Sequence, residues 1–106
     1  TNSFYFGGFL PVKGVKRSRE LESAIERAET SIFFESPHRI LKSLDALRAL
    51  APDRGICVGR ELTKKFETFH RGSAEEIFRE FEALPAIKGE ITLLVAGCGR
   101  RRASKS

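Results

Sequence analysis

Residues 30–39 join an apolar strand to the start of a helix with almost no loop between them. Residues 30–34 combine β-branched and aromatic side chains, which predicts a short buried strand. Ser36 and Pro37 follow, and this pair is typical of the N-cap and the first residue of a helix. Direct passage from a buried strand into a helix is common in α/β proteins, so this junction indicates an α/β fold.

The same alternation of strand-like and helix-like segments continues along the chain. The last apolar run, residues 90–96, is hydrophobic enough for a central strand. The predicted order is β-α-β-α-β-β-α-β, which indicates a mixed five-stranded sheet flanked by helices. We expect a single α/β domain over residues 1–97 and a basic, disordered tail over residues 98–106. The predicted strands span residues 4–10, 30–34, 56–61, 67–71 and 90–96, and the predicted helices span residues 18–28, 37–51 and 74–84.

Basic residues outnumber acidic residues, and their positions matter more than their total. The chain has 19 lysines and arginines against 14 acids, a net charge of +5. Four of the basic residues lie in the tail, so the domain itself is nearly neutral. A second basic group, Lys13, Lys16, Arg17 and Arg19, lies between the first predicted strand and helix. This group is consistent with a surface that binds RNA phosphates, and equally with a solvated loop.

The two cysteines, Cys57 and Cys98, give no indication of a metal site. Each lies in or beside an apolar strand, and the chain has no CxxC motif and no Cys/His cluster. We therefore expect reduced thiols and no bound metal. No apolar run approaches the roughly 20 residues of a membrane-spanning helix, and no signal peptide opens the sequence. We expect a cytoplasmic protein without membrane contact.

Charged side chains follow two predicted strands at their carboxyl ends, where open α/β sheets bind ligands. Glu35 follows one strand, and Arg60 and Glu61 close the next. Glu35 could act as a general base, or as a structural carboxylate that pairs with Arg39 four residues later. The structural role is favoured, because the spacing pairs Glu35 with no second acid or histidine. Pairing across the sheet is the corresponding structural explanation for Arg60 and Glu61.

Four motifs, in order along the chain, carry a resemblance to a known family. They are GGFLPVKG at 7–14, FESPHR at 34–39, RELTKKFE at 60–67 and KGE at 88–90. Together they resemble the bacterial small-subunit ribosomal RNA 2′-O-methyltransferases of the tetrapyrrole-methylase fold, which use S-adenosylmethionine. The resemblance is to the C-terminal half of that fold. Nothing in the sequence resembles the glycine- and proline-rich cofactor loops of the N-terminal half.

The resemblance implies a cofactor cleft between two halves, of which this chain supplies one wall. S-adenosylmethionine would lie against the strand ends, with much of the contact made by main-chain groups. The implied reaction is methyl transfer to a ribose 2′-hydroxyl of a cytidine in 16S ribosomal RNA, and the sequence identifies no catalytic base. The matching cofactor positions are Phe34, Glu35, Arg60, Glu61, Leu62, Gly89 and Glu90.

The resemblance also implies partners: 16S ribosomal RNA or the small ribosomal subunit, the N-terminal domain of the same protein, and a second copy in a homodimer. Lys13, Lys16 and Arg17 match the basic loop after the GFLP turn of the family, and Arg19 belongs to the same group. Two alternatives remain open: a non-catalytic RNA-binding α/β module, and a methyltransferase of this fold that acts on a tetrapyrrole or another small acceptor. Against the RNA-binding module, the sequence lacks a ribonucleoprotein-type motif and its phenylalanines lie mostly at core spacing.

Overall fold

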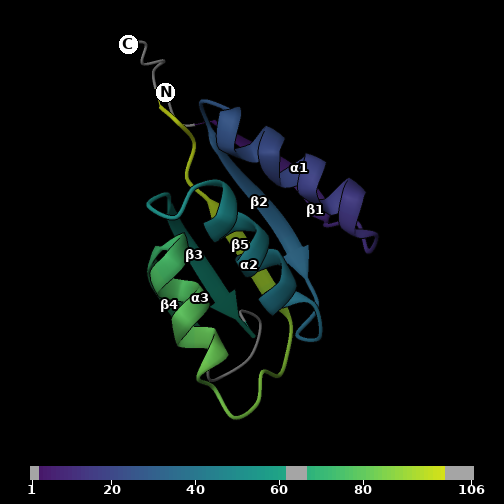
Figure 1. The fold of residues 1–106 in the computed structure, drawn as a ribbon, viewed down its shortest axis with the longest axis vertical. Helices are drawn as coiled ribbons and strands as arrows, with labels where there is room; N and C mark the ends of the chain where they lie inside the picture. The colour runs from purple at the N-terminus through teal and green to yellow at the C-terminus, as the bar shows by residue number, and fades with distance from the viewer. Residues whose placement is uncertain (1–2, 62–66, 100–106) are drawn as a thin grey trace.

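The computed structural model describes residues 3–61 and 67–99 (Figure 1). Within them, strands and helices follow one another in the predicted order. Leu62 and the basic residues from position 100 onward lie outside the described residues. The strands are β1 (Phe4–Phe9), β2 (Thr30–Glu35), β3 (Gly55–Arg60), β4 (Thr68–Ser73) and β5 (Ile91–Val95), and the helices are α1 (Gly14–Glu26), α2 (Ile40–Leu50) and α3 (Ala74–Glu82).

The strands form one mixed sheet in the order β1-β2-β5-β3-β4. β1 and β2 are parallel, β5 is antiparallel to its neighbours β2 and β3, and β4 is antiparallel to β3. β1, β2 and β3 therefore point the same way, and their carboxyl ends lie at one edge of the sheet. This arrangement confirms the predicted mixed five-stranded sheet, and it confirms that the last strand is central.

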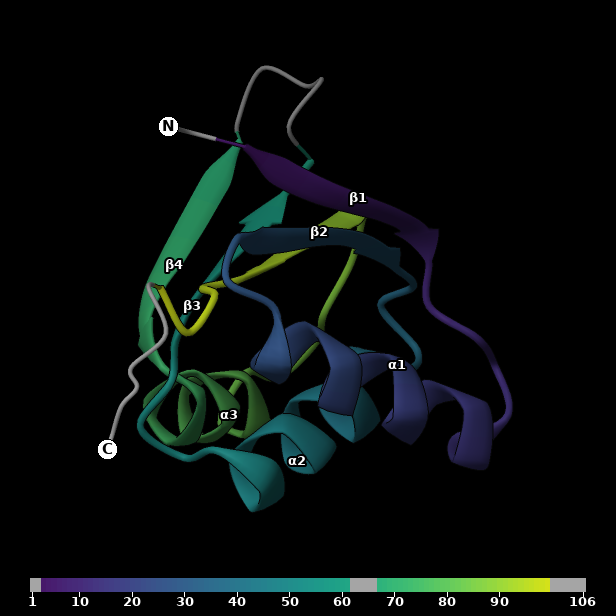
Figure 2. The same cartoon turned by 90° about the horizontal axis from the view of Figure 1, so that it is seen from above.

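The three described helices cover the same face of the sheet (Figure 2). Alternate residues of the central strands point into this helical layer, because side chains along a strand alternate between its two faces. Removal of these apolar side chains from water, at about 25 cal/mol per Å², is the main force that holds the two layers together. The fully buried core residues from the strands are Phe33, Val58, Leu93 and Val95, and those from the helices are Leu21, Ala24, Ile40, Leu44, Leu47, Ala74 and Phe81.

Helix α1 begins at Gly14 rather than at residue 18. Lys16 and Arg17 therefore lie in the helix and not before it, Arg19 lies in the helix as the predicted range 18–28 requires, and Lys13 is the N-cap residue. The apolar periodicity that predicted this helix begins only at Leu21, so it did not mark the earlier turns.

Helix α2 begins at Ile40 rather than at Pro37. The sequence predicts Ser36 as the N-cap, but its hydroxyl has no hydrogen-bond partner among the described residues, and Arg39 is the N-cap. The carbonyl oxygen of Ser36 instead accepts hydrogen bonds from the N–H groups of Arg39 and Ile40, at 3.1 and 3.0 Å, and closes a turn ahead of the helix. The N-cap prediction for Ser36 is therefore wrong.

The opposite face of the sheet carries no helix in the described structure (Figure 2). Four phenylalanines on this side, three from β1 and one from β4, are 48–75% exposed. The expectation that the phenylalanines lie mostly in the core is therefore wrong, because strand alternation places these four on the face that the helices leave uncovered. We call this surface the open sheet face and define it by Phe4, Phe6, Ile32, Cys57, Phe69 and Leu94.

Candidate functional site

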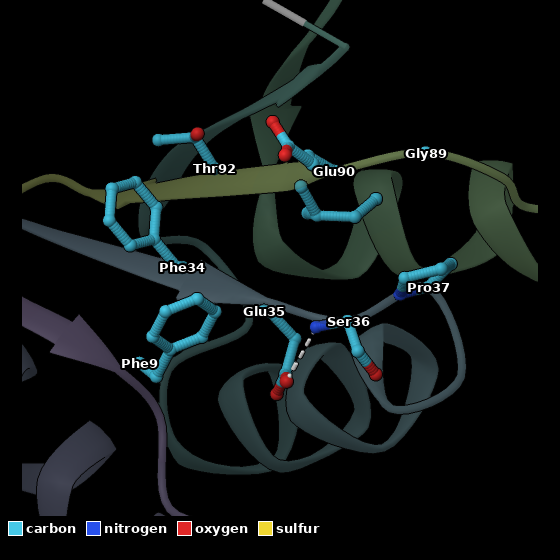
Figure 3. A pocket seen from close by; sticks show the side chains of 9 residues that line it. Phe9, Phe34, Glu35, Ser36, Pro37, Gly89, Glu90 and Thr92 are labelled. Carbon is cyan, nitrogen blue, oxygen red and sulfur yellow. Dashed lines mark hydrogen bonds between the residues drawn. The ribbon is translucent and has the colours of Figure 1, made fainter.

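A pocket of about 540 Å³ lies where β2 ends and β5 begins (Figure 3). Its volume is within the usual range of small-molecule sites. The pocket lies at the carboxyl ends of the parallel strands, the edge at which α/β sheets bind ligands. The lining residues are Phe9, Phe34, Glu35, Ser36, Pro37, Gly89, Glu90, Ile91 and Thr92.

Two aromatic rings form one wall of the pocket. The centroids of Phe9 and Phe34 are 5.2 Å apart, and the rings lie side by side in Figure 3. The strand register shifts between Phe6 and Gly8, and Gly8 has a φ of 71°, so that Phe9 comes to lie beside Phe34. Thr92 of β5 pairs with Phe34 and adds a hydroxyl to this otherwise apolar wall. A flat, apolar group with a few polar atoms would fit against such a surface.

The carboxylate of Glu35 is buried and bound to its own surroundings. Glu35 as a whole is 3% exposed. Its Oε1 accepts a hydrogen bond from the N–H of Ser36 at 2.8 Å, and its Oε2 accepts one from the hydroxyl of Ser43 at 2.6 Å. Arg39 Nε lies 3.5 Å from Oε1, at the predicted helical spacing. Both carboxylate oxygens are therefore occupied, which confirms the structural interpretation of Glu35. The residue fixes the end of β2 to helix α2.

A close contact between Glu61 and Gly89 shapes the neighbouring part of the site. Gly89 has a φ of 88°, and a Cβ atom added there would overlap the side chain of Glu61. Glu61 itself has a φ of 54°, which is uncommon for a residue other than glycine. Its N–H donates a hydrogen bond of 2.9 Å to the carbonyl oxygen of Glu90. The end of β3 is thus joined to the segment that lines the pocket.

The structure brings together four of the predicted cofactor residues: Phe34, Glu35, Gly89 and Glu90 line the pocket. Arg60 and Glu61 are not among the lining residues; Arg60 pairs with Ile91 across the sheet, as the structural explanation predicts. Leu62 lies outside the described residues.

Sequence reasoning missed Phe9, Ile91 and Thr92 as site residues. Phe9 belongs to the GGFLPVKG motif, and Thr92 is a polar residue within an apolar strand, so both positions carried a usable signal. Ser36 and Pro37 were interpreted only as a helix start, although both also line the pocket. Ile91 is an apolar strand residue like its neighbours, and no sequence signal distinguishes it.

The basic group lies on α1, one short connection beyond the pocket residue Phe9. Lys13, Lys16 and Arg19 are exposed, whereas Arg17 is half-buried and donates a hydrogen bond of 2.8 Å to the carbonyl oxygen of Val12. The first turn of the helix contains no acidic residue. Positive charge at a helix N-terminus opposes the helix dipole, so this end of α1 would be stabilised by an anion.

In the described ranges, 3–61 and 67–99, histidine, cysteine and acidic side chains form no group of three or more that could hold a metal ion. The helices of these ranges are also too short or too polar to cross a bilayer.

A scan of the chain against models of protein families finds no match. Individual relatives do match. The chain is 43% identical over 94 residues to the ribosomal RNA small subunit methyltransferase I of Bacillus subtilis, an alignment that covers 89% of the chain and 32% of the relative. The protein of the same name from Halalkalibacterium halodurans is 41% identical over 101 residues, which is 95% of the chain and 35% of that protein. The chain therefore spans about a third of the length of these curated relatives.

Two solved structures share the fold. The cobalamin biosynthetic enzyme CbiF, a cobalt precorrin-4 methyltransferase, matches with a TM-score of 0.61 over 91% of this chain and 41% of its own, at 15% identity. The methyltransferase CobJ matches with a TM-score of 0.62 over 97% of this chain and 44% of its own, at 18% identity. The chain thus has the fold of part of these methyltransferases, as the sequence motifs predict.

Proposed function

We propose that this chain is the C-terminal domain of an S-adenosylmethionine-dependent methyltransferase that modifies small-subunit ribosomal RNA. The observation that carries the proposal is 41–43% identity, over most of the chain, to relatives named ribosomal RNA small subunit methyltransferase I. CbiF and CobJ are only 15–18% identical, so a tetrapyrrole acceptor has much weaker support. The motif resemblance refines the target to a ribose 2′-hydroxyl of a cytidine in 16S ribosomal RNA, in the cytoplasm.

The pocket is proposed as one wall of the cofactor cleft. Its aromatic pair would contact a flat base, and the main-chain groups of Phe34, Glu35, Gly89 and Glu90 would bind the edge of that base. The hydroxyl of Ser36, buried without a partner in the described part of the chain, adds an unused polar group to the lining. Arg60 and Glu61 would act indirectly, because they hold the Gly89 segment in place. The cofactor itself would supply the methyl group and its leaving group.

This chain would not perform the reaction alone. Glu35, one of the two acids that line the pocket, accepts hydrogen bonds from Ser36 and Ser43, and it is therefore a poor general base. Methyl transfer depends on close alignment of donor and acceptor, which a cleft with a single wall cannot enforce. The remaining two-thirds of the relatives' length would supply the second wall.

Lys13, Lys16, Arg17 and Arg19 are proposed to contact the RNA. Three of them are exposed at the N-terminal end of α1, where bound phosphates would offset the unfavourable interaction with the helix dipole. A non-catalytic RNA-binding module would use the same residues, but it would not explain the pocket or the identity to named methyltransferases.

A chimera tests the proposal. The matching segment of the Bacillus subtilis relative is replaced by this chain, and methyl transfer from S-adenosylmethionine to unmodified small-subunit ribosomal RNA is measured. We expect transfer by the chimera and none by the isolated chain. Thr92→Trp, which fills the pocket, should lower transfer by the chimera at least about 100-fold, because the cofactor would be misplaced. Thr68→Trp, at an exposed position of β4, is the matched control. A folded chimera without transfer, or a Thr92→Trp chimera with full activity, would refute the proposal.

A further inference from the structure

The two acids that line the pocket have very different surroundings. Glu35 is buried, and both of its carboxylate oxygens accept hydrogen bonds. Glu90 is exposed, and its carboxylate forms no hydrogen bond or ion pair with another described residue. The main chain of Glu90 is nevertheless fixed, because its carbonyl oxygen accepts the hydrogen bond from the N–H of Glu61. Glu90 therefore offers the pocket an unused charged acceptor on a fixed backbone.

The carboxylate of Glu90 lies on the aromatic side of the pocket. In Figure 3 it is on the same side of β5 as the hydroxyl of Thr92, whereas Glu35 points toward α2. Thr92 pairs with Phe34, whose ring forms the aromatic wall with Phe9. Since a strand rises about 3.4 Å per residue, the Cα atoms of Glu90 and Thr92 are about 7 Å apart. A flat group against the rings would thus have its nearest substituent within reach of Glu90.

No cationic side chain lines the pocket. Its nine lining residues include no lysine, arginine or histidine, and the two charged residues among them are both acids. A phosphate in this pocket would be repelled by like charge. The described acids, histidines and cysteines also form no group that could hold a metal ion, which might otherwise bridge a phosphate to these acids. This composition favours a nucleoside over a nucleotide as the group that occupies the pocket.

We propose that the carboxylate of Glu90 accepts a hydrogen bond from a ribose hydroxyl of a nucleoside whose base lies against Phe9 and Phe34. The ribose is the substituent bonded directly to the base, and hydrogen bonds to an ionised acceptor are stronger than those between neutral groups. This inference rests on the proposed function and gives the side chain of Glu90 a role beyond the main-chain contact. Two ribose groups meet the requirement, that of the cofactor and that of the methylated nucleotide.

Nucleosides that lack the hydroxyls test the inference on the isolated chain. Adenosine and cytidine are each compared with their 2′,3′-dideoxy forms by amide chemical-shift changes in NMR spectra, at concentrations below saturation. For at least one of them, the shifts at Gly89 and Thr92 should be about 10-fold larger with the ribose form, the effect of one hydrogen bond to a charged group. Glu90→Gln should remove most of this ratio, whereas a purely structural role would weaken both forms equally. Glu82→Gln, an exposed acid of α3, is the control and should keep the ratio.

The chimera with the Bacillus subtilis relative identifies the source of the hydroxyl. If the cofactor supplies it, Glu90→Gln should raise the Kd for S-adenosylhomocysteine about 10-fold and leave the KM for RNA unchanged. If the RNA supplies it, the Kd should stay and kcat/KM for RNA should fall by a similar factor.

Three results would overturn the inference: equal shifts with the ribose and dideoxy forms, a ratio that Glu90→Gln leaves intact, and an active chimera that Glu90→Gln changes in neither measurement. The last result would leave the methyltransferase proposal standing. An inactive chimera would refute that proposal, and the NMR comparison would still decide the role of Glu90.

Discussion

Single residues at the pocket act mainly on the backbone around them. Glu35 receives hydrogen bonds from Ser36 and Ser43, and Glu61 packs against Gly89. Sequence spacing alone favoured a structural Glu35, because the spacing offered Arg39 as a partner. The contribution of Ser43 could not be predicted, because it depends on how α2 lies against the end of β2.

Ser43→Ala should lower the free energy of unfolding by about 1–3 kcal/mol, since it leaves Oε2 of a buried carboxylate without its donor. Ser23→Ala, at an exposed position of α1, should change stability by less than about 0.5 kcal/mol. Urea unfolding of both variants measures the difference. Equal midpoints for the two variants would show that the Ser43 hydrogen bond does not stabilise the fold.

Gly89→Ala should destabilise the chain more than Gly8→Ala does. Both glycines have positive φ, 88° and 71°, and the conformation alone costs about 1–2 kcal/mol for a residue with a Cβ atom. At Gly89 the added Cβ atom would also overlap the side chain of Glu61. At Gly8 no atom lies within 4 Å of the added Cβ atom. Thermal unfolding of the two variants compares these costs. A smaller loss for Gly89→Ala would contradict the described contact.

At the scale of elements, two serines look like helix caps in the sequence, and only one acts as a cap. Ser73 has Glu76 three residues later, which is the sequence pattern of a capping box, and the structure forms that box with hydrogen bonds of 2.9 and 3.1 Å. Ser36 has Arg39 at that position, and its own N–H is taken by Glu35. The capping box was therefore predictable from the residue pair, whereas the true start of α2 was not.

The two serines make a matched comparison. Ser73→Ala should cost about 1 kcal/mol of stability, because α3 loses its N-cap. Ser36→Ala should cost clearly less, since that hydroxyl has no partner among the described residues. Chemical unfolding of both variants gives the two values, and an equal or larger cost at Ser36 would indicate that its hydroxyl does cap α2.

The junction of α2 with α3 should make stability depend on pH. The pKa of Glu75 is lowered, first by its hydrogen bond from Arg48 and then by the one from Arg79, against an opposing effect of desolvation. The pKa of Arg48 is raised by its hydrogen bonds to Asp45 and Glu75. Because a lowered carboxyl pKa favours the ionised form in the folded state, Glu75 stabilises the fold above its ordinary pKa of 4.5. This stabilisation is lost as the pH falls through the lowered pKa.

Glu75→Gln should therefore be less stable than the unmodified chain near neutral pH, and the difference should vanish in acid. Urea midpoints measured across that range test the prediction. Glu82→Gln, an exposed position at the end of the same helix, is the control and should show no such trend. A constant difference for Glu75→Gln at every pH would contradict the assigned effect.

At the scale of the whole molecule, the strand order and mixed sheet followed from the sequence, because apolar runs and helical periodicities alternate clearly. The existence of an open sheet face could not be predicted from the sequence. Alternation assigns Phe4, Phe6 and Phe69 to one face of their strands, but it cannot show which face the helices cover. Four of the nine residues that line the pocket were likewise predictable from motif resemblance. Phe9 was not, because only the register shift at Gly8 brings it beside Phe34.

The central claim is that the pocket between β2 and β5 is one wall of a cofactor cleft that another part of the protein completes. Calorimetric titration with S-adenosylmethionine tests it most directly, on the isolated chain and on the chimera with the Bacillus subtilis relative. We predict saturable one-to-one binding by the chimera, its loss in the Thr92→Trp chimera, and no saturable binding by the isolated chain. Binding by the isolated chain as tight as that of the chimera would contradict the claim, as would a Thr92→Trp chimera that binds normally.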